Sequence, residues 1–245
     1  MGSGAIAFYI VMGWTLLITG GLTYLIVKQK NYDLISGFGN KTKEEQEQLI
    51  QNGYPQAIGK VLLHTWIILL ISFILGIFQV PYGFGIGLAI YLIYLLVGMV
   101  YVQKYYLVDK RKKYGVLTSV FSLIVLLGVG GLAFAGFQDE KPEVKDGVFK
   151  IHGMYGVEWP IEDIDEVTLL DKLPEVKLKS NGFAAAGRLK GSFRLEEPYG
   201  KGKLFVHKGY SPYLYIQKDD EYLILNRKNQ DELYELMVEI QSTNK

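Results

Sequence analysis

The sequence predicts a membrane domain of four transmembrane helices, followed by a soluble β-rich domain that ends in a helix. Three observations support this prediction: four long apolar runs, the confinement of basic residues to two loops in the first half, and a change to polar, charged sequence after residue 137. A chain of 245 residues is long enough for a membrane unit and a soluble unit with its own core.

Each apolar run has about the length that a helix needs to cross ~30 Å of hydrocarbon, which is ~20 residues. The predicted spans cover about residues 5–27, 61–80, 84–102 and 116–137. We therefore assign residues 1–137 to a four-helix transmembrane domain.

All ten lysine and arginine residues before residue 137 lie in two loops, 28–60 and 103–115. Short loops rich in lysine and arginine stay in the cytoplasm. If both loops are cytoplasmic, four spans place the N-terminus and the C-terminal domain on the outer side of the membrane.

The polar part of the chain differs in charge from the membrane part. Residues 137–245 carry 16 basic and 20 acidic side chains, and the stretch 138–147 (QDEKPEVKDG) is predicted to be a charged linker. Residues 148–245 then form the extracytoplasmic domain. The chain has no cysteine, so this domain must be stabilised by its core alone.

Short alternating segments separated by turn residues predict about seven strands in this domain, arranged as a small antiparallel barrel or sandwich. The first two form a hairpin, 148–151 and 154–157, and Asn181-Gly182 is one of the predicted turns. The apolar residues Leu233, Leu236 and Ile240 recur at helical spacing and predict a C-terminal helix.

The first basic loop contains a candidate functional motif. Thr42 and Glu45 have the spacing of a capping box and predict a short polar helix from about Lys43 to Gln51. A glycine-bearing turn with Gly37, Phe38 and Asn40 precedes it and is expected to lie against the lipid headgroups.

The segment 181–188 (NGFAAAGR) is the candidate contact site of the soluble domain. Its apolar tip contains Phe183, and five basic residues flank it: Lys177, Lys179, Arg188, Lys190 and Arg194. An apolar tip with a basic rim suits an anionic membrane surface or a ligand held there. The alternative is an ordinary hairpin connection with solvent-facing basic residues.

Chemistry-bearing patterns are otherwise sparse. No acidic residue lies within a span, and no nucleophile triad, phosphate-binding loop or metal-ligand spacing is present. The net charge of +1 gives no reason to expect nucleic-acid binding. We expect a non-enzymatic protein with no cofactor and no metal.

Two resemblances add to this reading. Residues 155–164 (YGVEWPIEDI), 171–182, 189–195 and 213–226 are similar, in order, to bacterial pleckstrin-homology-like domains. Residues 35–45 (ISGFGNKTKEE) resemble the "L-I-x-G-Y-N-T-M-S-K-E-E" loop of an uncharacterised Firmicute membrane family with three spans, although Phe38 stands where tyrosine is usual. The resemblances imply a bacterial cell-membrane protein.

Domains of this pleckstrin-homology-like type include the membrane-tethered immunity protein against the peptide antibiotic sublancin, so the resemblance implies a binding role, with immunity as its most concrete form. The lipid bilayer and a peptide or protein outside the cell are the expected partners. The alternative is a sensor or accessory subunit of a membrane complex such as a transporter. A transporter or pore of its own is a weaker third reading, and the sequence does not fix the oligomeric state.

Overall fold

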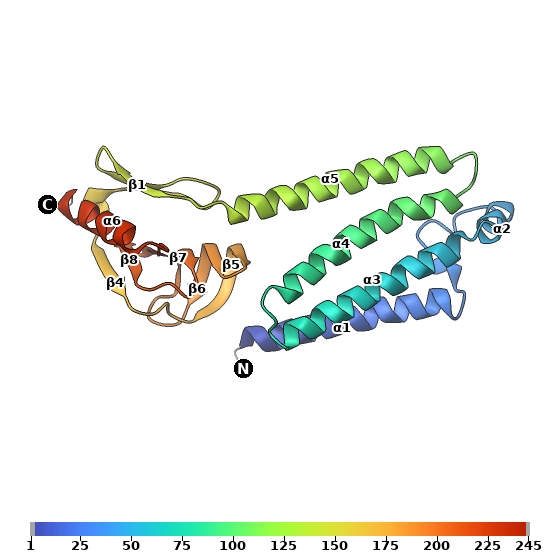
Figure 1. Cartoon of the computed structure of the whole chain (residues 1–245), viewed down its shortest axis with the longest axis horizontal. Helices are drawn as coiled ribbons and strands as arrows, with labels where there is room; N and C mark the ends of the chain where they lie inside the picture. Colours follow the sequence, from blue (N-terminus) through green and yellow to red (C-terminus); the bar gives the residue numbers. More distant parts are fainter. Residues whose placement is uncertain (1–2, 244–245) are drawn as a thin grey trace. The chain divides into compact units, whose positions relative to one another are not determined.

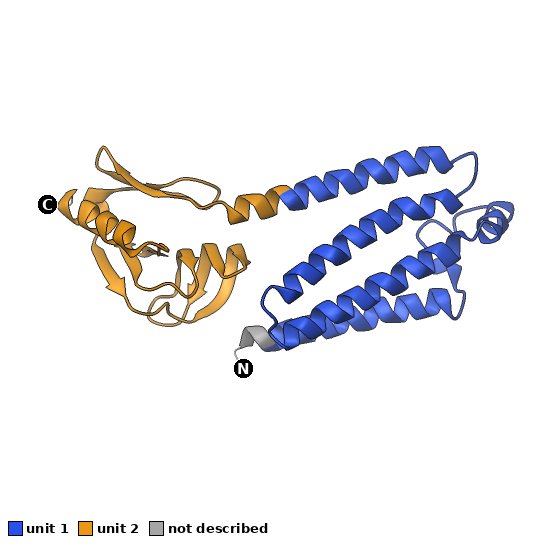
Figure 2. Cartoon of the chain, viewed as in Figure 1, with its two compact units in different colours: residues 1–130 blue, residues 131–245 orange. Residues whose placement is uncertain are grey.

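The computed structural model describes residues 3–243 and divides the chain into two compact units, residues 1–130 and 131–245 (Figure 2). The first unit is helical and the second is rich in strands (Figure 1). The predicted fold class is confirmed: four long apolar helices precede a sheet-rich region and a C-terminal helix.

The four helices are long and apolar enough to cross a membrane, and their bounds are α1 Ser3–Val27, α3 Tyr54–Ile77, α4 Gly83–Val102 and α5 Arg111–Phe137. Two of them begin earlier than predicted. α3 starts at Tyr54 rather than at residue 61, because Gly53 precedes it in a left-handed conformation and Pro55 suits a first helical turn. α5 starts at Arg111 rather than at residue 116, since its basic first turn is also helical.

Short elements structure the two basic loops. They are η1 Tyr32–Leu34, α2 Lys43–Gln51 and η2 Gln103–Tyr105. The predicted capping box is confirmed, because the Thr42 hydroxyl accepts from the Glu45 amide and the Glu45 carboxylate accepts from the Thr42 amide.

α3 packs against both α1 and α4 (Figure 1). Small residues allow the close approach of α3 and α4. A Cβ added at Gly98 would lie 2.6 Å from Val61 Cγ1, and one at Gly87 would lie 2.1 Å from Ser72 Oγ. Both α4 positions therefore require glycine at this spacing.

α5 is the least covered of the four spans. Only 11% of its most apolar window is buried, against 28% in α3. Most of its large apolar side chains are therefore free to face lipid.

The second unit contains nine strands: β1 Pro142–Lys145, β2 Val148–Ile151, β3 Val157–Pro160, β4 Glu166–Leu170, β5 Val176–Ala185, β6 Arg188–Leu195, β7 Lys201–His207, β8 Tyr213–Lys218 and β9 Glu221–Leu225. The first three form one antiparallel sheet. The other six form a second sheet in the order β4-β8-β9-β7-β6-β5, in which β7 and β9 run parallel. A turn, η3 Ile161–Asp163, joins the two sheets.

The larger sheet has a core on each face. On one face, Phe205, Leu214 and Leu223 join side chains of the three-stranded sheet and of α6 Gln230–Thr243. On the other, Leu204 and Ile224 cluster with Phe193 of β6. Successive side chains of β7 and β9 point to opposite faces of the sheet, so each strand contributes residues to both cores. Leu233, Leu236 and Ile240 of α6 are buried, as their helical spacing predicted.

Several sequence-based details differ from the structure. There are nine strands in two unclosed sheets, rather than the predicted seven or so, and β1 lies within the predicted linker 138–147. The second hairpin strand begins at Val157 rather than at residue 154. Asn181 and Gly182 lie inside β5, and the turn of that hairpin is Ala186-Gly187, where both residues have positive φ.

Candidate functional site

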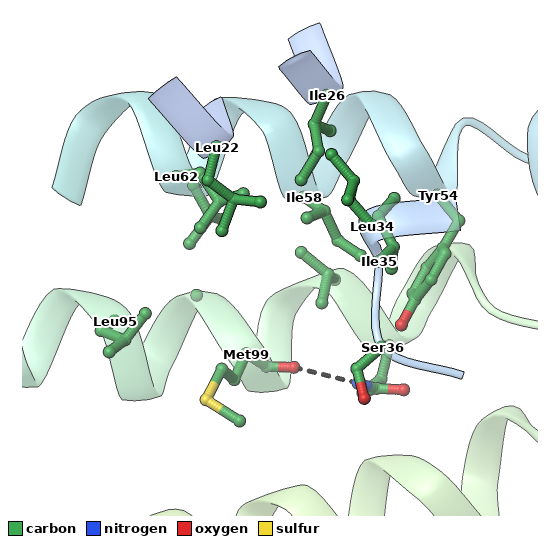
Figure 3. A pocket seen from close by; sticks show the side chains of 14 residues that line it. Leu22, Ile26, Leu34, Ile35, Ser36, Tyr54, Ile58, Leu62, Leu95 and Met99 are labelled. Atoms are coloured by element: carbon green, nitrogen blue, oxygen red, sulfur yellow. Dashed lines mark hydrogen bonds between the residues drawn. The ribbon is translucent and has the colours of Figure 1, made fainter. Parts of the chain in front are cut away.

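Residues 34–36, which directly precede the loop motif, line one end of an apolar cavity of about 280 Å³ between α1, α3 and α4 (Figure 3). Leu22 and Ile26 of α1 point toward Ile58 of α3, while Ile35 and Ser36 of the loop lie at one end (Figure 3). The motif residue Phe38 is buried beside Tyr32, with ring centroids 5.9 Å apart, and so anchors the loop directly after the residues that line the cavity.

The cavity offers little chemistry. Its polar side chains are Ser36, Tyr54 and Gln103, and the Gln103 amide already donates to the Met99 carbonyl at 3.2 Å. The volume is near the lower end of ligand pockets, about 300 Å³. Such a space accommodates a hydrocarbon segment, and its lining residues supply neither an acid nor a base.

The two basic loops are joined by one ion pair. Lys110 Nζ lies 2.6 Å from Glu45 Oε1, so the capping residue of α2 also reaches the segment before α5. This hydrogen bond lowers the pKa of Glu45 and raises the pKa of Lys110. Gly37 and Asn40 are exposed and lie in the turn before α2.

The candidate contact segment 181–188 lies beside the end of α5. Phe183 packs edge-on against Phe137, with centroids 4.9 Å apart, and a Cβ at Gly136 would lie 2.2 Å from the Phe183 ring. The predicted apolar loop is therefore part of a hairpin whose phenylalanine contacts the last turn of α5.

Two of the five basic residues bind the same helix end. Arg188 donates to the Phe137 carbonyl and pairs with Asp139 at 2.8 Å. Lys190 donates to the Gln138 carbonyl at 2.7 Å and pairs with Glu140 at 3.1 Å. Cations favour the unpaired carbonyls at a helix C-terminus, so both residues attach the domain to α5.

Two further side chains complete this attachment. Arg227 donates to the Glu140 carbonyl at 2.8 Å, and His207 Nε2 lies 3.3 Å from Asp139. Burial lowers the pKa of His207, and this effect exceeds the opposing attraction of Asp139.

The other three predicted basic residues lie away from the helix end and are exposed. Lys177 pairs with Glu175 at 2.7 Å, while Lys179 and Arg194 lie on β5 and β6. The six residues predicted as one contact site are therefore divided between an attachment to α5 and exposed positions on β5 and β6.

Three tyrosines form a second candidate surface on the larger sheet. Tyr199, Tyr215 and Tyr222 line a groove of about 410 Å³. Tyr215 and Tyr222 stack with centroids 5.5 Å apart, and Tyr199 meets both rings edge-on at 5.9 and 6.1 Å. Strand pairing explains this grouping. Gln217 of β8 is opposite Tyr222 of β9, so Tyr215, two residues before Gln217 on the same face, lies diagonally across from Tyr222. On its other side, Tyr215 is opposite Thr168 of β4.

The groove has an acidic rim. Glu166, Asp220 and Glu221 line it, and all three are exposed. Within residues 3–243 none of the three carboxylates forms an ion pair. The tyrosine content of this half is visible in the sequence, but the carboxylates converge only through long-range strand pairing.

Burial affects two of the groove tyrosines, Tyr222 and Tyr215. It raises the pKa of Tyr222 to about 12 and also raises the pKa of Tyr215. Tyr222 donates to the Gly200 carbonyl at 3.2 Å and Tyr215 to Gln217 Oε1 at 2.9 Å. The ring positions are thus fixed by hydrogen bonds.

In the described part of the chain, no three metal-ligating side chains come together. Residues 5–106 match a domain of unknown function, DUF3784. The matched region holds α1 to α4, and therefore both the loop motif and the apolar cavity. No curated protein and no solved structure matched the chain.

Proposed function

We propose that this chain is a non-enzymatic, multi-pass membrane protein whose sheet-rich domain binds a cationic peptide at the outer surface of a bacterial cell membrane. The observation that supports this most is the groove of stacked tyrosines with its unpaired carboxylates Glu166, Asp220 and Glu221.

The groove matches such a peptide in chemistry. Lysine and arginine side chains are attracted to the faces of aromatic rings, more strongly where water is excluded. Unpaired carboxylates beside the rings add charge complementarity, which raises the association rate and rejects anionic partners. Tyr215 and Tyr222 are held by hydrogen bonds, so they contribute rigid contact area at small entropic cost.

The most concrete form of this proposal is self-protection against a membrane-active peptide. The domain follows the last span directly, and its β5–β6 hairpin contacts the last turn of α5. The two basic loops favour the orientation with this domain outside. The sequence resemblance to pleckstrin-homology-like domains, which include a peptide-immunity protein, also favours a binding role.

The test compares two variants with the same change in charge. E166Q/D220N/E221Q removes the groove carboxylates, whereas E162Q/E235Q/E239Q removes three exposed carboxylates elsewhere on the domain. Cells lacking the gene are complemented with each variant and exposed to a panel of cationic membrane-active peptides. We expect protection from wild type and from the control variant, and loss of protection in the groove variant. Killing curves that do not depend on the gene would remove the immunity role.

A second candidate, an accessory subunit of a membrane complex, is favoured by the uncovered surface of α5. Gly128 and Gly130 have no atom within 4 Å of an added Cβ, and Leu123 and Leu127 are exposed. Small residues on a span permit close helix–helix approach. Crosslinking followed by affinity purification separates the two functions, because a stoichiometric membrane partner favours the accessory role.

A further inference from the structure

A groove of about 520 Å³ runs between α3 and α4 at the ends of these helices that join the two basic loops. Its polar lining comes from both helices and from η2: Gln56, Lys60, His64, Tyr94, Tyr101 and Tyr105. It lies on the opposite side of the Val61–Gly98 contact from the apolar cavity, since these two residues line both spaces.

Two lysines give this groove a positive charge. Lys60 lines it directly, and Lys104 Nζ lies 3.7 Å from the centroid of the Tyr101 ring and 4.8 Å from that of Tyr105. No acidic residue lines the groove. Among the residues that the structure describes, neither lysine has a carboxylate partner.

Hydroxyl groups lie beside these charges. Tyr101 and Tyr105 share a hydrogen bond of 3.2 Å, and the Tyr94 hydroxyl is 2.6 Å from His64 Nδ1. The last contact crosses from α3 to α4 and fixes one side of the groove. Phenol hydroxyls can both donate and accept, so they can reorient toward an incoming oxyanion.

The same helix faces continue as apolar surface away from the loops. Ile67 and Ile71 follow His64 along α3 at helical spacing, and Ile90 and Ile93 precede Tyr94 on α4. All four side chains are exposed. A ligand with a polar, negatively charged end in the groove could therefore lay a hydrocarbon chain along these two helices.

We propose that this groove binds the phosphate headgroup of an anionic phospholipid. Lys60 and Lys104 neutralise the phosphate, Tyr101 and Tyr105 donate hydrogen bonds to it, and an acyl chain follows the exposed isoleucines. Basic pockets between spans are suited to such headgroups. The apolar continuation favours a lipid over a free phosphate ion. The inference depends neither on the orientation of the chain in the membrane nor on the tyrosine groove of the sheet-rich domain.

The experiment measures lipid retained by the purified full chain in detergent, by native mass spectrometry, as phosphatidylglycerol or phosphatidylcholine is added. The variant K60Q/K104Q is compared with K28Q/K43Q, which removes two exposed lysines of the same basic region that lie outside the groove. A third variant, Tyr101→Phe, removes one hydroxyl and keeps the ring. Thermal unfolding of each variant confirms that it is folded.

We expect preferential retention of phosphatidylglycerol by wild type and by K28Q/K43Q. Retention should weaken about fivefold for each groove lysine removed, and less in Tyr101→Phe. Equal losses in the two lysine variants would indicate diffuse charge attraction and overturn the site. Displacement of the lipid by excess inorganic phosphate would overturn the lipid assignment in favour of a free-anion site.

Discussion

Lys190 carries a charge into the interior of the second unit. Its side chain is 8% exposed and that of its partner Glu140 is 12% exposed, and Glu140 Oε2 is buried with no hydrogen-bond partner among the described residues. Removing one member of a buried pair leaves the other charge uncompensated, which costs about 3 kcal/mol or more. We expect Lys190→Met to lower the free energy of unfolding of the full chain in detergent by about that amount.

The partner and an exposed control make this prediction specific. Lys190→Met/Glu140→Leu should recover much of the loss, because no buried charge remains. Lys179→Met changes an exposed lysine on the neighbouring strand and should have little effect. A loss in Lys190→Met no larger than that in Lys179→Met would contradict the role of the pair.

His207 makes the same attachment sensitive to pH. Its pKa lies below the ordinary value of 6.5, chiefly through burial, with Arg188, Arg227 and Lys228 acting in the same direction and Asp139 opposing them. As pH falls below about 6.5, the unfolded chain binds a proton before the folded chain does, so stability is lost. The stability that the neutral imidazole contributes is fully present above about pH 6.5. Unfolding midpoints measured between pH 7.5 and 5 should fall in wild type and change less in His207→Asn; equal slopes would contradict this.

At the scale of elements, α2 depends on its capping box. Thr42→Ala removes the hydroxyl that accepts from the Glu45 amide and should cost about 1 kcal/mol of helix stability. Hydrogen exchange of the α2 amides should accelerate accordingly, whereas Thr42→Ser retains the oxygen and should exchange like wild type. Faster exchange in both variants would indicate that the hydroxyl is not the cause.

Local signals explain which elements the sequence predicted well. The capping box of Thr42 and Glu45 is a local signal, and α2 has the predicted bounds, Lys43–Gln51. β1 depends instead on pairing with β2, so a short charged segment resembled a linker. Asn181-Gly182 resembled a turn, whereas Gly182 is needed because an added Cβ would lie 2.3 Å from the Lys190 carbonyl oxygen.

At the scale of the whole chain, the candidate sites were harder to predict than the fold. Hydropathy finds four spans because each is a continuous apolar run. The tyrosine groove combines β4, β8 and β9 with the turn before β7. Glu166 of β4 approaches Tyr222 of β9 only because β4 and β9 both pair with β8. The sequence predicted that Lys190 belongs to the basic rim of a membrane-contacting loop. In the structure, the strand register directs its side chain toward Gln138 and Glu140.

The membrane topology of the whole chain decides whether the tyrosine groove can bind a peptide outside the cell. Because the chain has no cysteine, this topology can be tested directly. Single cysteines are placed at Ser36, Ser180 and Ser242, all of which are exposed. With four spans and cytoplasmic basic loops, a membrane-impermeant thiol reagent added to intact cells should label Ser180→Cys and Ser242→Cys. It should label Ser36→Cys only after the membrane is opened, because that position lies in the first basic loop. Labelling of Ser180→Cys from the cytoplasmic side alone would reverse the orientation. It would exclude an extracellular peptide as the ligand of the tyrosine groove and leave the phospholipid site of α3 and α4 unaffected.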